Sequence, residues 1–145
     1  MSEDANDPLY EAMGLVRIVT MDPAGRATLE YRARPEMCHS GGVVQGGFVT
    51  GWIDAAMAHA IIGLHHEKGD FDVSPISLEL KISFFAPSRP GLIVAEGWIE
   101  QGGRSTCFAE GHLLDSTGKV LAKGSSTIRL MSNAKIEAAS RAAMA

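Results

Sequence analysis

One carboxylate stands alone in an apolar part of the chain, and its isolation suggests chemistry. Asp54 is the only acidic residue between Glu36 and Glu67, and its neighbours are alanines and large apolar residues. Burying an unpaired carboxylate is costly, so such a group neutralises, finds hydrogen-bond donors or is retained for a reaction. The plain structural alternative is an Asp that is satisfied by nearby hydroxyls or amides at the edge of a helix.

A pair of glycines adds a second chemical element. Gly46 and Gly47 open the same apolar segment, about two helical turns before Asp54. Glycines let another molecule approach the backbone closely, and a helix N-terminus offers free amides and a positive dipole end to a carbonyl oxygen that gains charge. Amides at the start of a helix, followed by a carboxylate two turns later, fit an acyl-transfer site.

The periodicity of the chain predicts the elements that position these groups. The segment from about Gly46 to His66 is apolar on nearly every side, which indicates a helix buried in a core. The residues before it predict a short helix over Pro8–Met13, two strands over about Leu15–Met21 and Ala27–Ala33, a turn at Asp22–Gly25 and a glycine-rich loop from His39 to Val44.

After this helix the pattern changes to alternating apolar and polar residues, which is typical of strands. The alternation runs over Ile76–Phe84, and further strands are expected at about Leu92–Gln101, Ser105–Leu114 and Lys119–Leu130, followed by an alanine-rich tail, Asn133–Ala145, as a frayed helix. Short turns between these strands imply an antiparallel sheet. One buried helix and one antiparallel sheet predict an α+β fold in which the sheet wraps the helix.

Composition narrows the class of protein. A chain of 145 residues fits a single domain, and a net charge of −4 with a pI near 5.7 argues against a general nucleic-acid binder. Cys38 and Cys107 form no CxxC pair, which predicts neither a disulfide framework nor a zinc site and favours a reducing cytoplasm. The polar residues Met1–Asp7 lack an apolar signal core, and no apolar run is expected to span a membrane because Asp54 interrupts the central helix.

The residues around Asp54 also carry a family resemblance. Two glycines, six further residues and then Asp before an alanine-rich helix resemble the signature of hotdog-fold acyl-CoA thioesterases, in particular the phenylacetate-pathway (PaaI-like) type. The order and spacing of the elements resemble this superfamily over about residues 10–131, so one hotdog domain is expected over residues 1–145. The family signature usually reads His-Gly-Gly, with an Asn six residues before the His. This chain has Gln45 and His39 at those two positions.

The resemblance assigns catalytic roles to individual residues. Asp54 would act as the nucleophile or as a general base on water, and the Gly46 amide would polarise the thioester carbonyl. Ser77 matches a position where the family often has a Ser or Thr directed at the water or the carboxylate; an ordinary exposed strand serine is the alternative. Gln45 can donate a hydrogen bond as His does, and His39 can donate one or act as a base.

An acyl-CoA also needs groups that hold its phosphates and its acyl chain. Arg104, with Ser105 beside it, matches a position that the family tends to use near coenzyme A. Arg89 and Lys123 are further candidates, and each is otherwise a solvated surface charge. The remaining candidates for substrate binding are Gly47, Phe48 and Trp52, of which the two aromatic residues would line an acyl pocket for a bulky or aromatic group.

The resemblance therefore implies an acyl-CoA thioesterase that converts a small, medium-chain or aromatic acyl-CoA to the free acid and CoA. No metal or separate cofactor is expected, since the remaining histidines, His59, His65, His66 and His112, lack ligand spacing. In the family the helix N-terminus and the carboxylate come from different subunits, which implies a homodimer or a dimer of dimers. We expect a cytoplasmic protein without nucleic-acid or membrane partners.

Two other functions stay open at this point. A hotdog-fold enoyl-CoA hydratase or dehydratase has a His in the loop before the helix and a carboxylate within it, and His39 and Asp54 loosely match that arrangement. A non-catalytic acyl-CoA-binding module is the third possibility, because two polar positions of the signature are changed. Retention of Asp54 weighs against the binding module, because binding alone gains nothing from a carboxylate in an apolar helix.

Overall fold

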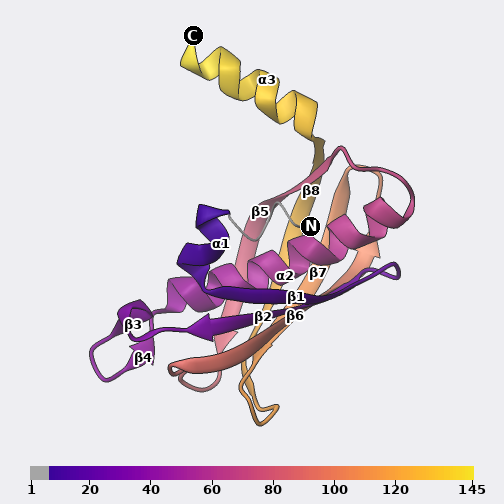
Figure 1. Ribbon diagram of the computed structural model, residues 1–145. Helices are drawn as coiled ribbons and strands as arrows, with labels where there is room; N and C mark the ends of the chain where they lie inside the picture. Colours follow the sequence, from indigo (N-terminus) through magenta and orange to yellow (C-terminus); the bar gives the residue numbers. More distant parts are fainter. Residues whose placement is uncertain (1–6) are drawn as a thin grey trace.

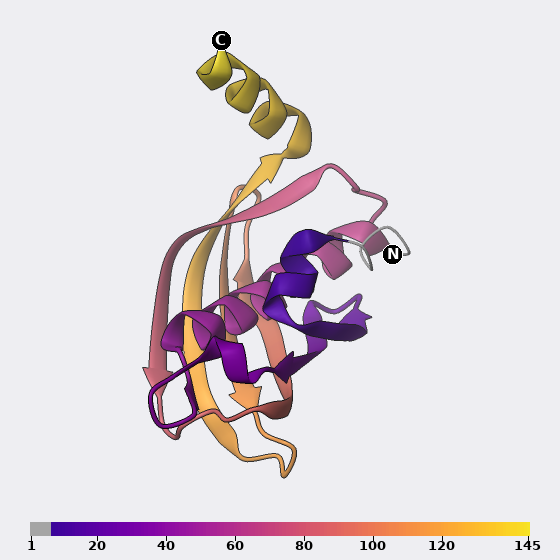
Figure 2. The same cartoon turned by 60° about the vertical axis from the view of Figure 1, so that its left-hand side comes forward.

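A six-stranded antiparallel sheet curls around one long helix (Figures 1 and 2). The structure is a computed structural model that describes residues 7–145. The strands lie in the order β1-β2-β6-β7-β8-β5, and every pairing is antiparallel. The predicted α+β architecture is thus confirmed. The elements in chain order are α1 (Pro8–Met13), β1 (Leu15–Asp22), β2 (Arg26–Ala33), a 3-10 turn (Pro35–Met37), β3 (Cys38–His39), β4 (Val43–Val44), α2 (Gly46–Glu67), β5 (Val73–Phe84), β6 (Gly91–Gly102), β7 (Thr106–Leu114), β8 (Val120–Ser132) and α3 (Asn133–Met144).

The central helix α2 forms because its sequence supplies both a cap and an apolar surface. The side chain of Gln45 caps the first turn by accepting a hydrogen bond from the Gly47 amide at 2.8 Å. Gly97 in β6 lets the sheet approach closely, because a Cβ there would lie 2.4 Å from the carbonyl carbon of Ala56. The helix therefore rests directly on the sheet, with these side chains fully buried: Trp52, Ile53, Ala56, Met57, Ala60 and Ile61.

Helix α2 is long enough and apolar enough to cross a membrane. The expectation that no segment has the length of a membrane span is therefore wrong. The helix has 22 residues and is apolar over most of its length. Half of its most apolar stretch is buried inside the structure, and the helix packs on all six strands of the sheet. The core helix of a globular domain meets the same test, so length and hydropathy are weak evidence for a membrane protein here.

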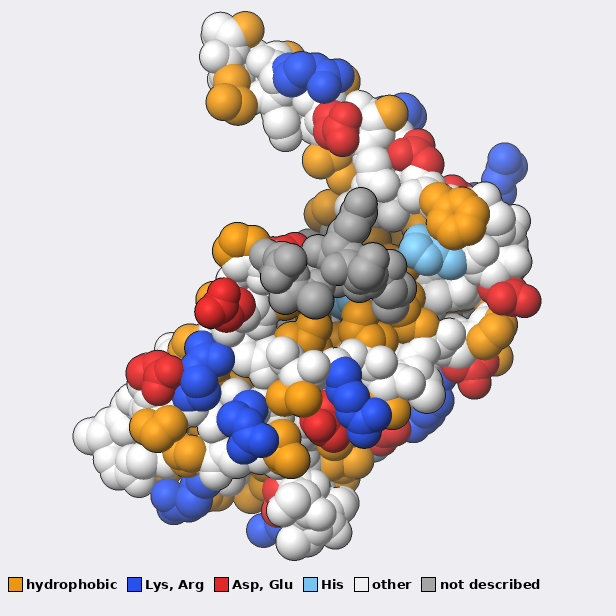
Figure 3. Space-filling view, viewed as in Figure 1, with side chains coloured by type: hydrophobic (Ala, Val, Ile, Leu, Met, Phe, Trp, Pro, Cys, Tyr) orange, Lys and Arg blue, Asp and Glu red, His pale blue; other side chains and the backbone are white. Residues whose placement is uncertain are grey.

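Several boundaries differ from those expected. β5 begins at Val73, earlier than the alternation indicated, and includes Pro75, which an edge strand tolerates. The loop between His39 and Val44 forms a small hairpin, β3 with β4, because two-residue strands leave no periodic signal. The tail forms α3, whose first turn is capped by the Ser132 hydroxyl, which accepts from the Lys135 amide at 3.1 Å. In Figures 2 and 3, α3 stands away from the body of the domain.

The edge strand β5 leaves apolar side chains uncovered. Leu78 is 60% exposed and Phe84 is 55% exposed, although an alternating strand is expected to bury its apolar side. A register shift between Ser77 and Glu79 interrupts the pairing of β5 with β8. Since β5 is the last strand of the sheet, its outer backbone groups have no neighbouring strand within residues 7–145. An uncovered apolar edge of this kind is a pairing surface.

Candidate active site

The carboxylate of Asp54 is held by a serine from the edge strand. Ser77 Oγ donates a hydrogen bond to Asp54 Oδ1 at 2.6 Å, and both residues are half-buried. Of the two alternatives for Ser77, the structure thus has the serine directed at the carboxylate. The hydroxyl satisfies one carboxylate oxygen and fixes the side chain, which leaves the other oxygen available to a water molecule or a substrate.

The other polar groups near this part of α2 are neutral or structural. Burial raises the pKa of Tyr31 well above its ordinary value, and the charges of Tyr10 and Asp54 add to that shift, so the phenol stays protonated at neutral pH. His59 is buried, its Nδ1 donates to the Ala55 carbonyl at 2.7 Å, and its Nε2 lies 3.2 Å from the Tyr10 hydroxyl. These contacts fix His59 within the fold.

The N-terminus of α2 offers a backbone donor. The first amides of a helix have no intrahelical acceptor. The Gly47 amide donates to the side-chain oxygen of Gln45, and the Gly46 amide has no acceptor within residues 7–145. A Cβ at residue 46 would lie 3.2 Å from Phe84 Cζ, so glycine at this position lets the aromatic ring lie against the backbone. An amide in this position can donate to an oxygen that gains negative charge.

His39 lies in β3, close to the start of α2. Its Nδ1 is 2.9 Å from the Ser40 carbonyl oxygen. Because a carbonyl can only accept, Nδ1 carries the proton and Nε2 keeps its lone pair in the neutral ring. His39 can therefore accept a proton at Nε2, whereas donating from that nitrogen requires a charged ring or the other tautomer.

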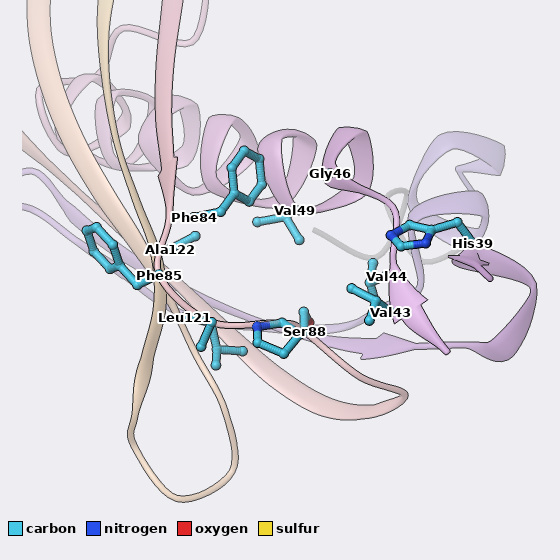
Figure 4. A pocket seen from close by; sticks show the side chains of 12 residues that line it. His39, Val43, Val44, Gly46, Val49, Phe84, Phe85, Ser88, Leu121 and Ala122 are labelled. Atoms are coloured by element: carbon cyan, nitrogen blue, oxygen red, sulfur yellow. The ribbon is translucent and has the colours of Figure 1, made fainter. Parts of the chain in front are cut away.

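A pocket of about 410 Å³ adjoins the helix N-terminus, and its volume lies within the range of small-molecule sites. In Figure 4, Gly46 and Val49 lie on one side of the pocket, and Ser88 and Leu121 lie on the opposite side. The wall is mostly apolar, and it consists of His39, Val43, Val44, Gly46, Val49, Phe84, Phe85, Ala86, Pro87, Ser88, Leu121 and Ala122.

The Asp54 carboxylate and the Gly46 amide do not lie together within one chain. Asp54 is absent from the lining of the pocket that adjoins Gly46. The two residues are eight positions apart on α2, which corresponds to about 12 Å along the helix axis. One chain thus brings Ser77 to Asp54, and His39 to the N-terminus of α2, but it does not bring the carboxylate to the amide.

The candidate phosphate ligands lie in three separate places. Arg104 borders a pocket of about 260 Å³ near His65, at the C-terminal end of α2, and the Ser105 carbonyl accepts from the Leu130 amide at 2.8 Å. Arg89 Nη1 donates to the Gly41 carbonyl at 3.2 Å and so joins two loops. Lys123 lines a third pocket, of about 210 Å³, together with Lys81, Ser83, Phe85, Glu110, Gly124 and Ser125.

The aromatic residues of the pocket are not the expected ones. Trp52 is 0% exposed, its indole N–H donates to the Met13 carbonyl at 2.8 Å, and neither Trp52 nor Phe48 lines the pocket. Phe84 and Phe85 line it instead. The available signal was this adjacent aromatic pair, which interrupts the apolar–polar alternation where β5 ends at Phe84.

Metal ligation has no geometric basis in the described part of the chain. Within residues 7–145, no three or more His, Cys, Asp or Glu side chains are grouped so that they could hold a metal ion. Two histidines there each lie beside one carboxylate: His65 is 3.2 Å from Asp70, and His112 is 2.7 Å from Glu96.

This chain is similar in sequence and in structure to known proteins. The model of the thioesterase superfamily matches residues 41–122. A candidate esterase of Saccharolobus solfataricus is 28% identical over 108 residues, which cover 74% of this chain and 73% of the relative. The phenylacetic acid degradation operon protein PaaI of E. coli has a similar structure, with a TM-score of 0.77 and 19% identity over 90% of this chain and 88% of PaaI.

A second solved structure is similar at higher identity. It comes from Ralstonia eutropha JMP134, is described as a candidate thioesterase related to phenylacetic acid degradation, and has a TM-score of 0.74. It is 27% identical, with 85% of this chain and 89% of that one covered. The structural matches agree with the observed sheet wrapped around α2. The chain belongs to the thioesterase superfamily and has the hotdog fold.

Proposed function

We propose that this protein is an acyl-CoA thioesterase that hydrolyses small, medium-chain or aromatic acyl-CoA esters. The observation that carries the proposal is the hydrogen bond from Ser77 to Asp54, on a helix whose free N-terminal amide adjoins an apolar pocket. Asp54 removes a proton from water as the water oxygen attacks the thioester carbon. The Gly46 amide donates to the carbonyl oxygen as it becomes negative. The C–S bond then breaks, and the sulfur takes the proton to leave as CoA.

The proposal includes a homodimer as the catalytic unit. The separation of about 12 Å between Gly46 and Asp54 along α2 leaves each chain with half of a site. A second copy that pairs along β5 covers the exposed Leu78 and Phe84 and brings its own Asp54 toward the first copy's pocket. Isologous pairing of this kind completes two equivalent sites at once. A dimer of two such dimers is compatible with the same sites.

The remaining features of the proposal follow from size and composition. A pocket of about 410 Å³ with mostly apolar walls suits a short aliphatic or single-ring acyl group. Arg104 is the proposed phosphate ligand, because it matches the position that the family tends to use near coenzyme A, whereas Arg89 is engaged with the Gly41 carbonyl. We also propose that residues 1–145 form one domain. Both cysteines, Cys38 and Cys107, are free thiols, which supports a cytoplasmic location.

A panel of acyl-CoA esters tests this function. The purified protein is incubated with acetyl, hexanoyl, benzoyl and phenylacetyl esters, and free thiol is measured with a chromogenic disulfide. We expect turnover of at least one ester, without loss of rate in EDTA. Tight binding of these esters without release of thiol would contradict the proposal and favour the binding module.

An enoyl-CoA hydratase is the second candidate, and one observation favours it. The lone pair on His39 Nε2 at the edge of the pocket suits a proton-abstracting base. His39→Asn separates the two reactions. Thioester hydrolysis by the variant should stay within about tenfold of wild type, since Asp54 remains the base and Asn keeps a hydrogen-bonding group at this position. Hydration would fall by roughly 100- to 10,000-fold on loss of a general base. Wild-type hydration of an enoyl-CoA without thiol release would establish the hydratase.

A further inference from the structure

The C-terminal helix α3 has little packing within its own chain. It has 12 residues, none of its side chains is buried, and its main contact within residues 7–145 is with β8. In Figure 3 it stands apart from the body of the domain. Isolated helices of this length are only marginally stable in water, and most of the stability of a helix in a protein comes from packing its apolar side. We therefore expect another surface to cover α3.

One side of α3 is apolar, and the opposite side is charged. Ile136, Ala139 and Ala143 follow one another at spacings of three and four, which places them in one stripe along the helix. Glu137 and Arg141 lie on the other side, where their side chains are 3.9 Å apart and largely exposed. Ile136 is half-buried, whereas Ala139 and Ala143 are exposed. The chain itself thus leaves most of the stripe uncovered.

Helix α3 begins at the opposite end of β5 from the pocket. Its N-cap residue, Ser132, pairs with Val73 at the start of β5, and the Asn133 amide donates to the Asp72 carbonyl at 3.1 Å. The pocket lies at the other end of this strand, where Phe84 lines it. The 12 residues of β5 span roughly 36 Å, whereas a helix of 12 residues is about 18 Å long. Since α3 also points away from the sheet (Figure 2), it does not reach the pocket of its own chain.

A two-fold dimer brings the two ends of β5 together. When two copies of an edge strand pair antiparallel about a two-fold axis, the start of each strand lies near the end of the other. Asp54 is bonded to Ser77, and Gly46 lies against Phe84. The carboxylate of one chain therefore meets the amide of the other when Ser77 lies opposite about the partner's Phe84. In that register the first residue of β5, four positions earlier, lies opposite about the partner's Ser88, four positions later.

This register places α3 beside the pocket of the second copy. Strand β8 lies one strand spacing from β5, and the partner's segment lies one spacing beyond it. The first residues of α3 therefore fall about 10 Å from the partner's residues 85–88, which line the partner's pocket. In this segment Phe85 is 62% exposed, and Pro87 is exposed as well. An apolar helix stripe and an exposed aromatic rim remove each other's apolar surface from water.

We propose that the apolar stripe of α3 packs on residues 85–88 of a second copy and adds to the wall of that copy's pocket. This inference rests on the homodimer of the proposed function. Each site then contains α2 and Phe84 of one chain together with Asp54 and α3 of the other. The added wall is apolar, so it favours acyl chains that are long enough to reach it over shorter ones. Because the dimer is two-fold, two α3 helices cover two pockets.

Chemical cross-linking tests the placement of α3. Ala139→Cys is combined with Pro87→Cys in a Cys38→Ser background, treated with a short bis-maleimide and analysed on a denaturing gel. A covalent dimer should form, and neither single variant should cross-link. Ala138→Cys with Pro87→Cys is the matched control, because Ala138 faces away from the stripe, and it should cross-link several-fold less. Equal cross-linking in the two pairs, or none in either, would overturn the inference.

Selectivity for chain length tests whether α3 belongs to the pocket wall. The kcat/KM values of hexanoyl-CoA and acetyl-CoA are compared on wild type, Ala139→Glu and the matched control Ala138→Glu. The ratio of hexanoyl to acetyl should fall roughly tenfold in Ala139→Glu, because a carboxylate in the stripe removes the apolar cover from about two methylene groups. The ratio should be unchanged in Ala138→Glu, which carries the same charge on the exposed side. An unchanged ratio in both variants would remove α3 from the pocket wall and overturn the inference.

Two further measurements separate this inference from the proposed reaction. Calorimetric titration of both esters into Asp54→Asn, with and without Ala139→Glu, reports the same ratio as dissociation constants without turnover. If wild type releases no thiol but the Ala139 and Pro87 positions cross-link, the thioesterase proposal fails and the placement of α3 stands. If thiol is released but no cross-link forms, only the placement fails. Cosedimentation of wild type, but not of Ala139→Glu, with phosphatidylglycerol vesicles would assign the stripe to a membrane surface and overturn the inference.

Discussion

The first turn of α2 faces an apolar pocket and offers a backbone amide, whereas the turn that contains Asp54 presents a carboxylate held by a serine. The first region has no acidic side chain in its lining, and the second has no pocket of its own among the described cavities. An amide donor acts best where water is excluded, while a carboxylate that activates water must be reachable by water. Their separation on one helix gives each group its own surroundings, and in the proposed homodimer a second copy brings the two together.

Removal of the Asp54 carboxylate should have the largest effect on activity, because it leaves only the amide region intact. Asp54→Asn should reduce thiol release by roughly 100- to 10,000-fold, the range for loss of a general base or nucleophile. The fold should persist, because the amide can still accept from Ser77 and the site is half-buried. Steady-state kinetics and far-UV circular dichroism measure both effects. A variant with near wild-type turnover would remove Asp54 from the mechanism.

The amide of the first turn can be deleted without deleting a side chain. Gly46→Pro removes the N–H at a helical position that favours proline, and Gly46→Ala keeps the N–H as a matched control. The proline variant should lose about 100- to 1,000-fold in kcat, as for loss of one oxyanion donor. The alanine variant should lose far less, because its Cβ requires only a small shift of the Phe84 ring. Equal losses in the two variants would indicate crowding by Phe84 rather than loss of a donor.

Mixed oligomers test whether the Gly46 amide of one chain and the Asp54 carboxylate of another chain form one site. Gly46→Pro and Asp54→Asn chains with different tags are co-expressed, and the hetero-oligomer is isolated through both tags. If each site uses one chain's amide and the other chain's carboxylate, one intact site forms per dimer and about a quarter to a half of wild-type activity returns. Activity no higher than that of the two parent variants would place the whole site within one chain.

The smallest expected effect concerns the far end of α2. Arg104→Ala should raise KM for an acyl-CoA by about two- to tenfold and leave kcat nearly unchanged, because an exposed guanidinium contributes phosphate binding rather than chemistry. The difference should shrink at high salt, since exposed charges are screened. Lys68→Ala, an exposed cation at the C-cap of α2, is the control. An unchanged KM at low salt would leave Arg104 as a solvated surface charge.

The sequence predicted the helix and the sheet because their patterns are long and regular. The apolar run of α2 and the alternation after it determine the element types almost without context. The contact between Asp54 and Ser77 did not follow from periodicity: the family resemblance suggested it, with an ordinary exposed strand serine as the alternative. The sequence did not predict, however, which face of α2 packs in the core and which lies near the pocket. Every side of α2 is apolar, so periodicity did not distinguish Trp52, which lies in the core, from residues near the pocket.

The pocket itself was beyond sequence reasoning for a topological reason. Ser88 is part of a Pro- and Gly-rich segment that reads as a solvent-exposed turn. It is buried because this turn docks on the β3–β4 hairpin, more than forty residues away in the chain, through the bond between Val44 and Ser88. Likewise, Leu78 is exposed on β5, the edge strand of the sheet, and local alternation does not indicate which strand lies at the edge.

The position of α2 in the chain order has a consequence for biosynthesis. Of the six strands in the sheet around this helix, β1 and β2 precede it and four follow it, and the last of them ends at Ser132. At translation rates of about 5–20 residues per second, the helix leaves the ribosome several seconds before its cover is complete. During that interval a segment as apolar as a membrane span lacks the strands that cover it, which makes α2 an aggregation hazard of the nascent chain.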